Sequence, residues 1–352
     1  MMSDLRRQLL WKYYYRYKQL GDVDVEGGYT FLQKILMFIN ITKVNLFGEY
    51  LTPNLLKNKV ELNPGNVSNI ISDFLSKDEP CMVARFGANE QRIVANYISI
   101  VSPCKNVFKS ILGKTPFWWW NKRVRKEFNI NAGFFPDDTE YLERYAKMMI
   151  EDTKCVDVLL TWFGWESLLL KDNNKVALVG LQEAEPWWQP EPWSRYLKGK
   201  KVLVIHPFAD LIESQYKNRN KLFKDPNVLP EFELRTLKAV QSIGGKVNSF
   251  INWFDALEWM ERQMDKIEYD VVLIGCGAYG FCLAAHAKRN GKIAIHMGGV
   301  LQLFFGIKGN RWEDKNYHPT YDYTLLFNEF WVKPDSYLRP DNAEQIEGAC
   351  YW

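Results

Sequence analysis

The stretch DVVLIGCGAYGFCLAAHAKRNGKIAIHMGG, residues 270–299, joins an apolar strand to an Ala-rich helix through a glycine turn and then enters a second apolar strand. Gly275, Gly277 and Gly280 have G-x-G-x-x-G spacing, which lets a backbone turn tightly and approach a diphosphate at a helix N-terminus. A close-packed strand-to-helix turn without a ligand accounts for the same glycines. The stretch therefore predicts a strand-turn-helix-strand unit with a candidate nucleotide site.

The end of the second strand tests the dinucleotide interpretation. A dinucleotide enzyme carries an Asp or Glu about 20 residues after the glycines, where it holds the ribose hydroxyls. Here the strand Lys292–Ile295 runs into His296-Met297-Gly298-Gly299 instead. An NAD(P)-dependent oxidoreductase is therefore the less favoured alternative, and a phosphate-bearing ligand recognised differently at its sugar fits better.

Short apolar strands alternate with amphipathic helices along most of the chain. The strands are expected at Met82–Phe86, Val156–Thr161, Val176–Leu181, Lys201–Ile205, Lys246–Phe250, Val271–Ile274 and Lys292–Ile295. The helices are expected at Val67–Leu75, Asn89–Ile98, Asp137–Glu151, Leu211–Phe223, Glu231–Ser242, Phe254–Lys266 and Tyr279–Asn290. This alternation predicts an α/β fold: a Rossmann-like, doubly wound, mainly parallel sheet with an N-terminal helical extension. In such a sheet, ligands collect at the carboxyl ends of the strands.

Four segments are expected along the chain. Residues 1–60 form a helical extension that is basic and aromatic, and residues 61–195 form a first α/β half with Trp-rich loops. Residues 196–312 form a second α/β half with the glycine turn, and residues 313–352 form a C-terminal tail that packs on the core. The boundary between the halves is placed in the loop Pro186–Gly199.

Composition narrows the functional classes. At 352 residues and 47% hydrophobic content, the chain can bury one large core or two ordinary ones. A net charge of +3 gives no reason to expect a nucleic-acid partner. Six cysteines without C-x-x-C spacing, and no leader sequence, favour a reducing, cytoplasmic location. The four histidines lack paired spacing, which argues against structural zinc.

The N-terminal extension has two interpretations. Its basic residues surround Leu, Trp and Tyr side chains, and they are Arg6, Arg7, Lys12, Arg16 and Lys18. With the apolar segment Phe31–Ile41, this pattern suits a peripheral contact with an anionic membrane at the inner face of the cell membrane, since neither segment is long enough to span it. Two amphipathic helices that pack on the main domain, or on a second subunit of a homo-oligomer, explain it as well.

Polar side chains follow several of the expected strands, in the runs 85–90, 161–166, 206–210 and 296–299. Because the carboxyl ends of parallel strands share one edge, these residues and the glycine turn are expected to face one cleft. Arg85 offers a planar fork for a phosphate, Glu90 a metal ligand or a base, and His206 a phosphate donor or proton acceptor. The structural alternatives are that Arg85 and Glu90 pair with each other or cap the helix, and that His206 only fills a turn.

Tryptophans gather in predicted loops, at Trp118, Trp119, Trp120, Trp162, Trp165, Trp187, Trp188 and Trp193. Their flat faces suit sugar rings, whose hydroxyls could reach Glu183, Glu185 or Glu191. Loop aromatics that close a second core or a subunit contact explain them equally well.

The segment ARFGANE, residues 84–90, resembles the R-[FY]-G-D-G-E motif of bacterial GT-D-type glycosyltransferases, a group first described as a domain of unknown function. Three later segments are similar to those of polysaccharide-locus proteins of the same group: HPFADLIESQY (206–216), the run 274–299 and QLFFGIKGNRW (302–312). The similarity spans residues 67–312. In the family, the acidic pair of the D-x-E motif ends a strand of a Rossmann-like domain and serves the metal and diphosphate of a nucleotide sugar.

This chain departs from the family motif. The first acid is Ala88 here and the central glycine is Asn89, so Glu90 alone remains of the pair and is the one candidate ligand in this motif for Mg²⁺ or Mn²⁺. A single carboxylate with an amide is a poor site for either ion. One interpretation is that the diphosphate is neutralised without metal by Arg85, Lys308, Arg311 and the glycine amides. The other is that catalysis has been lost.

The resemblance implies a glycosyltransferase that takes a nucleotide diphosphate sugar and extends a lipid-linked or protein-linked glycan in cell-surface polysaccharide or glycoprotein biosynthesis. The catalytic residues would be Glu90, Arg85 and His206. The donor-binding residues would be Gly87, Asn89, Gly275, Gly277, Tyr279, Gly280, His296, Gly298, Gly299, Gln302, Lys308 and Arg311. The alternative from another class is a non-catalytic scaffold or regulator of a surface-glycan assembly complex.

Overall fold

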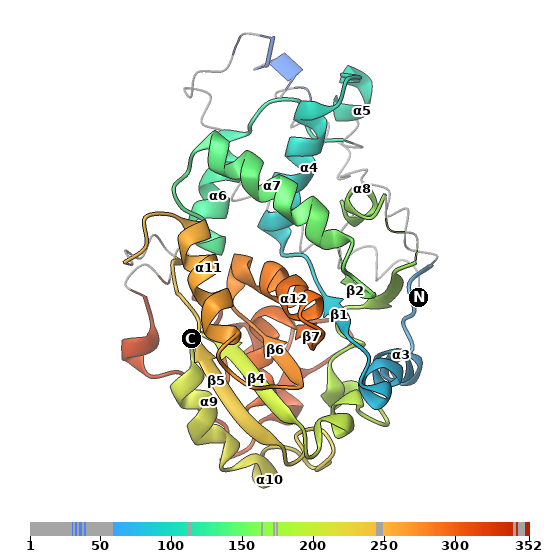
Figure 1. The fold of residues 1–352 in the computed structure, drawn as a ribbon, viewed down its shortest axis with the longest axis vertical. Helices are drawn as coiled ribbons and strands as arrows, with labels where there is room; N and C mark the ends of the chain where they lie inside the picture. Colours follow the sequence, from blue (N-terminus) through green and yellow to red (C-terminus); the bar gives the residue numbers. More distant parts are fainter. Residues whose placement is uncertain are drawn as a thin grey trace.

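The computed structural model describes residues 59–111, 115–162, 165–171, 173, 175–243, 249–340, 343 and 349–352, and residues 30, 32, 33, 35, 36 and 39 of the N-terminal extension. These residues build one seven-stranded sheet (Figure 1). Its strands are β1 (Cys81–Ala84), β2 (Val158–Thr161), β3 (Ala177–Gly180), β4 (Lys201–His206), β5 (Glu233–Lys238), β6 (Val271–Ile274) and β7 (Ile293–His296). The expected helical extension, residues 1–60, otherwise lies outside the described residues.

The strand order is β3-β2-β1-β7-β6-β4-β5, and every neighbouring pair is parallel. The predicted doubly wound α/β fold is confirmed. Both expected halves of the chain contribute to this one sheet, because β1 pairs directly with β7, with Val83 opposite Ile295. The boundary near residue 196 therefore falls within a continuous sheet.

Helices cover both faces of the sheet, and α7, α11 and α12 lie in front of it in Figure 1. The first face carries α4 (Ala88–Val101), α6 (Lys122–Ala132), α7 (Thr139–Thr153), α8 (Glu166–Leu169), α11 (Trp253–Met264) and α12 (Gly280–Arg289). The second carries α3 (Pro64–Lys77), η3 (Pro186–Trp188), η4 (Trp193–Leu197), α9 (Ala209–Tyr216), α10 (Arg219–Leu222), α13 (Leu301–Phe304), α14 (Asn310–Glu313) and η8 (Tyr323–Leu326). The remaining short helices are α5 (Val107–Ile111), η6 (Gly277–Tyr279), η7 (Gly298–Val300) and η9 (Ser336–Leu338).

The two layers of helices create two cores. Successive strand residues point to opposite faces, so Met82 and Ala84 of β1 pack in the first core while Cys81 and Val83 pack in the second. Strands buried on both sides have continuous apolar sequences, which is why the apolar runs located β1, β6 and β7 well.

Asparagine side chains fix the start of three helices. Asn63 begins α3, Asn121 begins α6 and Asn252 begins α11, and each side-chain oxygen accepts hydrogen bonds from two N–H groups of the first turn. These N–H groups have no partner inside the helix, so the cap determines where each helix begins.

One edge of the sheet differs from the sequence prediction. The prediction of a helix at Glu231–Ser242 is wrong, because Glu233–Lys238 forms strand β5, which pairs along its whole length with β4. An edge strand needs few apolar residues, so its mixed sequence ELRTLK also fits a helix, and only the pairing with β4 decides. Most of the strand expected at Lys246–Phe250 lies outside the described residues, and its described end, Ser249 and Phe250, is not in a strand.

Within the described part of the chain, no helix combines the length and the apolarity that crossing a bilayer requires.

Candidate functional site

The carboxyl ends of β1, β7, β6 and β4 lie side by side, and the segments that follow them leave towards opposite faces. The helices after β1 and β6, which are α4 and α12, pack on the first face. Those after β7 and β4, which are α13 and α9, pack on the second face. Neighbouring strands whose connections diverge open a crevice at this edge, where open α/β sheets bind ligands. The fold therefore brings the turns after these four strands to one edge.

Arg85 is the first residue after β1 and lies against the end of β7. Its guanidinium carbon is 4.7 Å from the centre of the Trp162 ring. A Cβ atom placed on Gly298, which has a φ of +70°, would stand 3.2 Å from Arg85 Cδ. No carboxylate of the described residues lies within ion-pair distance of Arg85. Its half-buried guanidinium is therefore in place to bind an anion.

The ends of β1 and β2 are tied together around this arginine. Trp162 Nε1 donates to the Phe86 carbonyl at 2.9 Å. The backbone N–H of Trp162 donates to Glu166 Oε1 at 3.1 Å, and Thr161 Oγ1 donates to the other oxygen of the same carboxylate. Glu166 is fully buried, so its carboxylate holds the turn that presents Trp162 to Arg85.

Glu90 lies in the first turn of α4, and its carboxylate folds back over Gly87. A Cβ atom on Gly87 would stand 1.9 Å from Glu90 Oε2, so a side chain at this position would push the Glu90 carboxylate away. The Glu90 side chain is 9% exposed. Burial and then the charge of Glu90 raise the pKa of Tyr145 well above its usual value, which places the carboxylate close to that phenol. A carboxylate at a helix N-terminus is also stabilised by the helix dipole. Asn89 is half-exposed beside it.

His206 and His296 are the last residues of β4 and β7, and both are buried. Burial lowers the pKa of His206 to about 3, and burial together with the nearby Arg85 charge lowers the pKa of His296 to about 3. Both rings are therefore neutral at physiological pH. His206 Nδ1 accepts from Phe208 N at 3.0 Å, which leaves the proton on Nε2. His296 interacts with the Arg85 backbone, although its Nδ1 makes no hydrogen bond of standard geometry among the described residues.

The glycine turn is packed mainly against protein. A Cβ on Gly275 would stand 2.6 Å from the Gly298 carbonyl and 2.9 Å from His206 Cδ2, and a Cβ on Gly280 would stand 2.3 Å from His296 Nε2. Close packing of strand ends thus explains these two glycines. Gly277 has a φ of +61° and its nearest neighbour would be 3.6 Å away, so it is the least crowded of the three.

Tyr279, in the same turn, is a core residue. Its ring stacks on Trp253 with centroids 4.8 Å apart and an angle of 4° between the planes. Its hydroxyl lies 3.2 Å from Ser242 Oγ, and the side chain is 2% exposed.

The C-terminal tail covers the next predicted residues. Gln302 is 1% exposed, and its Nε2 faces the carbonyls of Ile307, Lys308 and Tyr351 at 3.3, 3.0 and 3.1 Å. A Cβ on Gly299 would stand 2.2 Å from Tyr351 Cε1. Gln302 therefore ties the turn after α13 to the tail, and the Tyr351 ring lies on Gly299.

Arg311 and Lys308 lie beside aromatic rings. The Arg311 guanidinium carbon is 4.9 Å from the centre of the Tyr351 ring, and Nη2 is 2.9 Å from Cys350 Sγ. Lys308 Nζ is 5.4 Å from the centre of the Phe327 ring. Tyr351 contacts both Gly299 and Arg311, so its ring connects Arg311 to the sheet edge that holds Arg85.

The loop tryptophans divide into buried and half-exposed groups. Trp193 is 1% exposed, stacks on Phe304 and donates from Nε1 to the Ala184 carbonyl at 2.8 Å, so it is a core residue. Trp188 stacks on Tyr321 with centroids 5.1 Å apart. The segment Trp118–Trp120 is half-buried.

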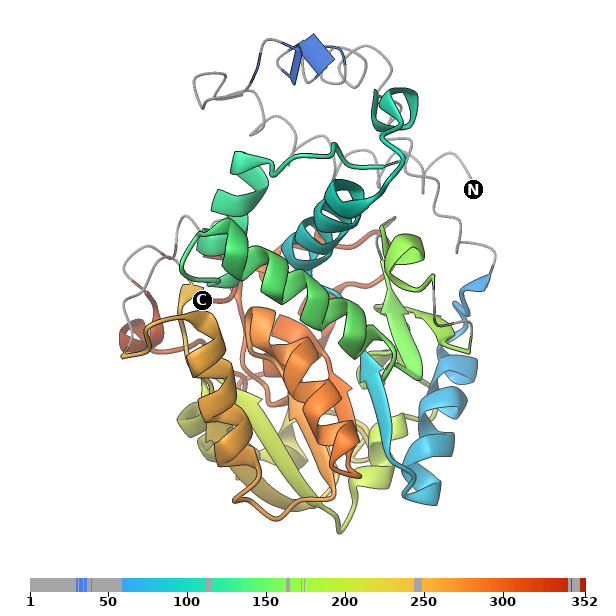
Figure 2. The same ribbon diagram turned by 45° about the horizontal axis from the view of Figure 1, so that its top comes forward.

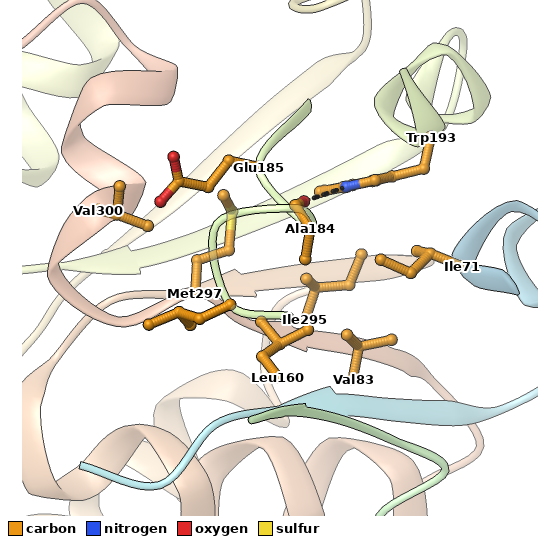
Figure 3. Close-up of a pocket in the computed structure, with 10 residues that line it drawn as sticks. Ile71, Val83, Leu160, Ala184, Glu185, Trp193, Ile295, Met297 and Val300 are labelled. Carbon is orange, nitrogen blue, oxygen red and sulfur yellow. Dashed lines mark hydrogen bonds between the residues drawn. The ribbon is translucent and has the colours of Figure 1, made fainter. Parts of the chain in front are cut away.

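Glu185 borders the cavity drawn in Figure 3, which has about 10 Å³ of room, close to the space of one water molecule. The other lining residues are apolar or aromatic: Ile71, Val83, Leu160, Leu181, Ala184, Trp193, Ile295, Met297 and Val300. Tyr323 Oη donates to Glu185 Oε2 at 2.8 Å and Trp188 Nε1 donates to it at 2.9 Å. Burial outweighs these hydrogen bonds and raises the pKa of Glu185 to about 8. This cavity is too small for a nucleotide.

The described residues do not fit a divalent cation. They contain no group of three His, Cys, Asp or Glu side chains placed to hold a metal ion. Glu90 lies over Gly87 and near Tyr145. We therefore assign no step to Mg²⁺ or Mn²⁺.

A known family matches the second half of the chain, from the residue after η3 to the end of α13. Residues 189–304 match the GT-D fold-like domain. This match confirms the predicted resemblance to GT-D proteins for the part of the chain that carries His206, the glycine turn and Gly298. The ARFGANE motif, with Arg85 and Glu90, lies outside the matched residues.

Two solved structures also align with the chain. One is described as the highly conserved domain of unknown function 1792 with a distinct glycosyltransferase fold, and the other as a selenomethionine-substituted structure of that domain. Each alignment covers 78% of this chain and 96% of the other, at 12% and 11% identity and TM-scores of 0.34 and 0.33. No curated protein matches the chain.

Several residues that shape the edge were not among the predicted site residues. Glu166 and Tyr323 are the clearest examples. Glu166 belongs to the polar run 161–166 after an expected strand, so the sequence singled out this turn without assigning a role to Glu166. Tyr323 and Tyr351 come from the C-terminal tail, and the sequence gives no sign of what they contact.

Proposed function

We propose that the protein is a glycosyltransferase that moves a sugar from a nucleotide diphosphate donor to a lipid-linked or protein-linked glycan of the cell surface. The GT-D fold-like match supports a glycosyltransferase-type role. One observation carries the proposal further. The Arg85 guanidinium stacks on Trp162, lies against Gly298 and has no carboxylate partner among the described residues. This is the arrangement that a diphosphate needs at the carboxyl edge of a parallel sheet.

The proposed transfer reaction needs one group that holds the diphosphate and one base that accepts a proton. The bond from the sugar C1 to the diphosphate oxygen breaks, the nucleoside diphosphate leaves with the electron pair, and the acceptor oxygen bonds to C1 as its proton passes to a base. Arg85 holds the diphosphate and balances the charge that develops on it. Glu90, in the helical turn that follows Arg85, is the proposed base.

The histidines act as neutral groups in this proposal. Because burial lowers the pKa of His206 to about 3, its ring offers a neutral Nε2–H to a phosphate oxygen and adds no charge. His296 Nδ1, buried beside Arg85 and without a hydrogen bond of standard geometry among the described residues, offers a second polar contact to the ligand.

The test is isothermal titration of UDP- and GDP-sugars against the wild type, Arg85→Ala and Arg262→Ala. Arg262 is an exposed arginine on α11 and serves as the matched control. We expect the wild type and Arg262→Ala to bind one donor class equally, and Arg85→Ala to bind it at least about tenfold more weakly, because a charge-assisted contact to a phosphate contributes roughly 1.5–3 kcal/mol. Absence of nucleotide binding by the wild type would end the proposal.

A non-catalytic scaffold or regulator of a surface-glycan assembly complex is the second candidate. It is favoured by the replacement of the motif acid by Ala88 and by the packing of Gly275 and Gly280 against His206 and His296. The two functions differ in one measurement. A glycosyltransferase releases nucleoside diphosphate when donor and acceptor are both present, whereas a scaffold captures partner proteins without consuming donor.

A further inference from the structure

The far end of α4 carries an exposed apolar surface. We call residues 101–109 the lobe tip; it contains the last residue of α4 and most of α5. Phe108 is 78% exposed, Val101 is 55% exposed and Val107 is 37% exposed. Three exposed apolar side chains within nine residues make this segment a candidate contact surface.

The lobe tip lies within a strongly basic part of the sequence. Residues 91–126 contain no Asp or Glu, and their eight basic residues are Arg92, Lys105, Lys109, Lys114, Lys122, Arg123, Arg125 and Lys126. The three arginines form ion pairs with Glu127 and Asp137, outside this segment. The lysines Lys105, Lys109 and Lys122 are exposed. Lys105 also caps α4, since its Nζ donates to the carbonyls of Ser99 and Ile100. The positive charge beside the apolar tip therefore comes from exposed lysines, because the arginines are paired with acids outside the segment.

A loop of aromatic residues is fixed to the helix that leads to the tip. Asn96, in the middle of α4, donates from Nδ2 to the carbonyls of Phe117 and Trp119 at 2.8 and 2.9 Å and fixes this loop to the helix. The rings of Phe117 and Trp119 stack 4.6 Å apart, and Trp118 meets Trp119 edge-on. All three side chains are half-buried. Half-exposed Trp beside Lys is the composition that suits the headgroup layer of a membrane.

A second apolar stripe lies at the same end of the molecule. Leu32, Ile35 and Ile39 are helical and are 63%, 37% and 41% exposed, and their spacing of three and four residues puts them on one helical face. Figures 1 and 2 both place this blue segment and α5 at the end of the molecule opposite α10. Two segments with exposed apolar side chains thus lie at the same end of the molecule.

We propose that the lobe tip docks on an anionic membrane surface. The apolar side chains enter the boundary between headgroups and acyl chains, and the lysines bind lipid phosphates. Charge complementarity selects this occupant, since exposed lysines beside exposed Phe and Val, in a segment without Asp or Glu, match anionic lipid. Single-stranded nucleic acid would use the aromatic rings and lysines but gains nothing from exposed valines.

The position of α4 relates the docked surface to the candidate site. The helix begins directly after Gly87, beside Arg85, and ends in the lobe tip. Its 14 residues span about 20 Å. The carboxyl edge of the sheet would therefore lie within about 20 Å of the docked lobe tip. Delivery of a lipid-linked acceptor to Arg85 follows only if the proposed function is right, whereas docking itself does not depend on it.

Cys104 allows a direct test on the full-length chain. It is the one exposed cysteine among the six, at the centre of the lobe tip, so an environment-sensitive fluorophore can be attached there, with Cys104→Ser protein as background. We expect the emission to shift to the blue with vesicles that contain phosphatidylglycerol and not with pure phosphatidylcholine vesicles. An unchanged emission with anionic vesicles overturns the proposal, even if the protein sediments with them, because another segment would then be the contact.

Variants measure the contribution of the tip by vesicle sedimentation. We expect Phe108→Ser, and the double variant Lys109→Glu with Lys122→Glu, to weaken partitioning at least about tenfold each. The control is Lys217→Glu with Lys224→Glu, two exposed lysines near α10 at the opposite end. Equal losses in test and control variants, or a label response to a single-stranded oligonucleotide in place of vesicles, contradict the proposal.

Discussion

Gly298 shows how a single residue links two strand ends. It occupies the left-handed region, and the space where a side chain would begin is filled by Arg85. Gly275 packs against the carbonyl of the same residue. The sequence indicated glycines at these turns, but glycine spacing alone does not separate a phosphate cradle from a close approach of two backbones. Gly298 combines the two roles. Its backbone packs closely against Gly275, and its turn positions Arg85, which is proposed to bind the donor.

Replacing Gly298 with alanine should therefore have two effects. Its φ of +70° costs about 1–2 kcal/mol of stability for an L-residue, and the new Cβ displaces the Arg85 side chain. We expect urea denaturation to show that loss and donor titration to show weakened binding. Gly199→Ala is the matched control, with a φ of +75° and no neighbouring atom within 4 Å of the new Cβ. Equal donor affinity in both variants would mean that Arg85 does not depend on this turn.

At the scale of elements, the sequence predicts buried strands more accurately than exposed ones. The strands β1, β6 and β7 are covered on both faces and were located to within two residues, because their apolar runs reflect burial directly. The sequence of the edge strand β5 predicts a helix instead, because half of its residues face solvent and carry no such pattern. Its identity depends on hydrogen bonds to β4, which local sequence does not encode.

The contact between η3 and η8 gives a prediction at this scale. Glu185, before η3, accepts hydrogen bonds from Tyr323 of η8, and burial raises its pKa to about 8. Because the pKa of Glu185 is higher in the folded protein than its value near 4.5 in the unfolded chain, the protonated carboxyl group stabilises the fold at low pH. This contribution is complete below about pH 4.5 and is lost as the pH rises through about 8. Glu185→Gln removes this titration. Its stability relative to the wild type should therefore rise with pH, by up to about 1.4 kcal/mol per pH unit.

Urea unfolding of both proteins at pH 5 and pH 8 measures this effect. Tyr323→Phe, which keeps the carboxyl group but removes its phenol donor, is the control and should titrate like the wild type or more steeply. A constant difference between Glu185→Gln and the wild type at the two pH values would show that Glu185 keeps an ordinary pKa.

At the scale of the molecule, the C-terminal tail closes the second core against the site. Trp352 is 6% exposed and donates from Nε1 to the Leu338 carbonyl at 3.1 Å, while Tyr351 lies on Gly299. The backbone N–H of Arg311 donates to the Cys350 carbonyl at 3.1 Å. The tail therefore connects the turn after β7, α14 and the end of the chain into one packed layer.

Removal of the Trp352 side chain should loosen that layer. We expect Trp352→Ala to lower the free energy of unfolding by about 3 kcal/mol, since a buried Trp loses both transfer energy and packing. Tyr337→Ala is the control; this residue is 72% exposed, and its loss should change stability by less than about 0.5 kcal/mol. Similar denaturation curves for the two variants would mean that the tail does not stabilise the fold.

The sequence by itself determined the α/β architecture and the turns at which a site could lie, because strand burial, helix periodicity and glycine spacing are local patterns. It did not determine which of those turns touch. Arg85 meets Trp162 and Gly298, and Glu185 meets Tyr323, through contacts between residues that are far apart along the chain. Only the order of the strands and the course of the tail bring such residues together, because packing partners are selected by shape and by hydrogen bonds across the fold.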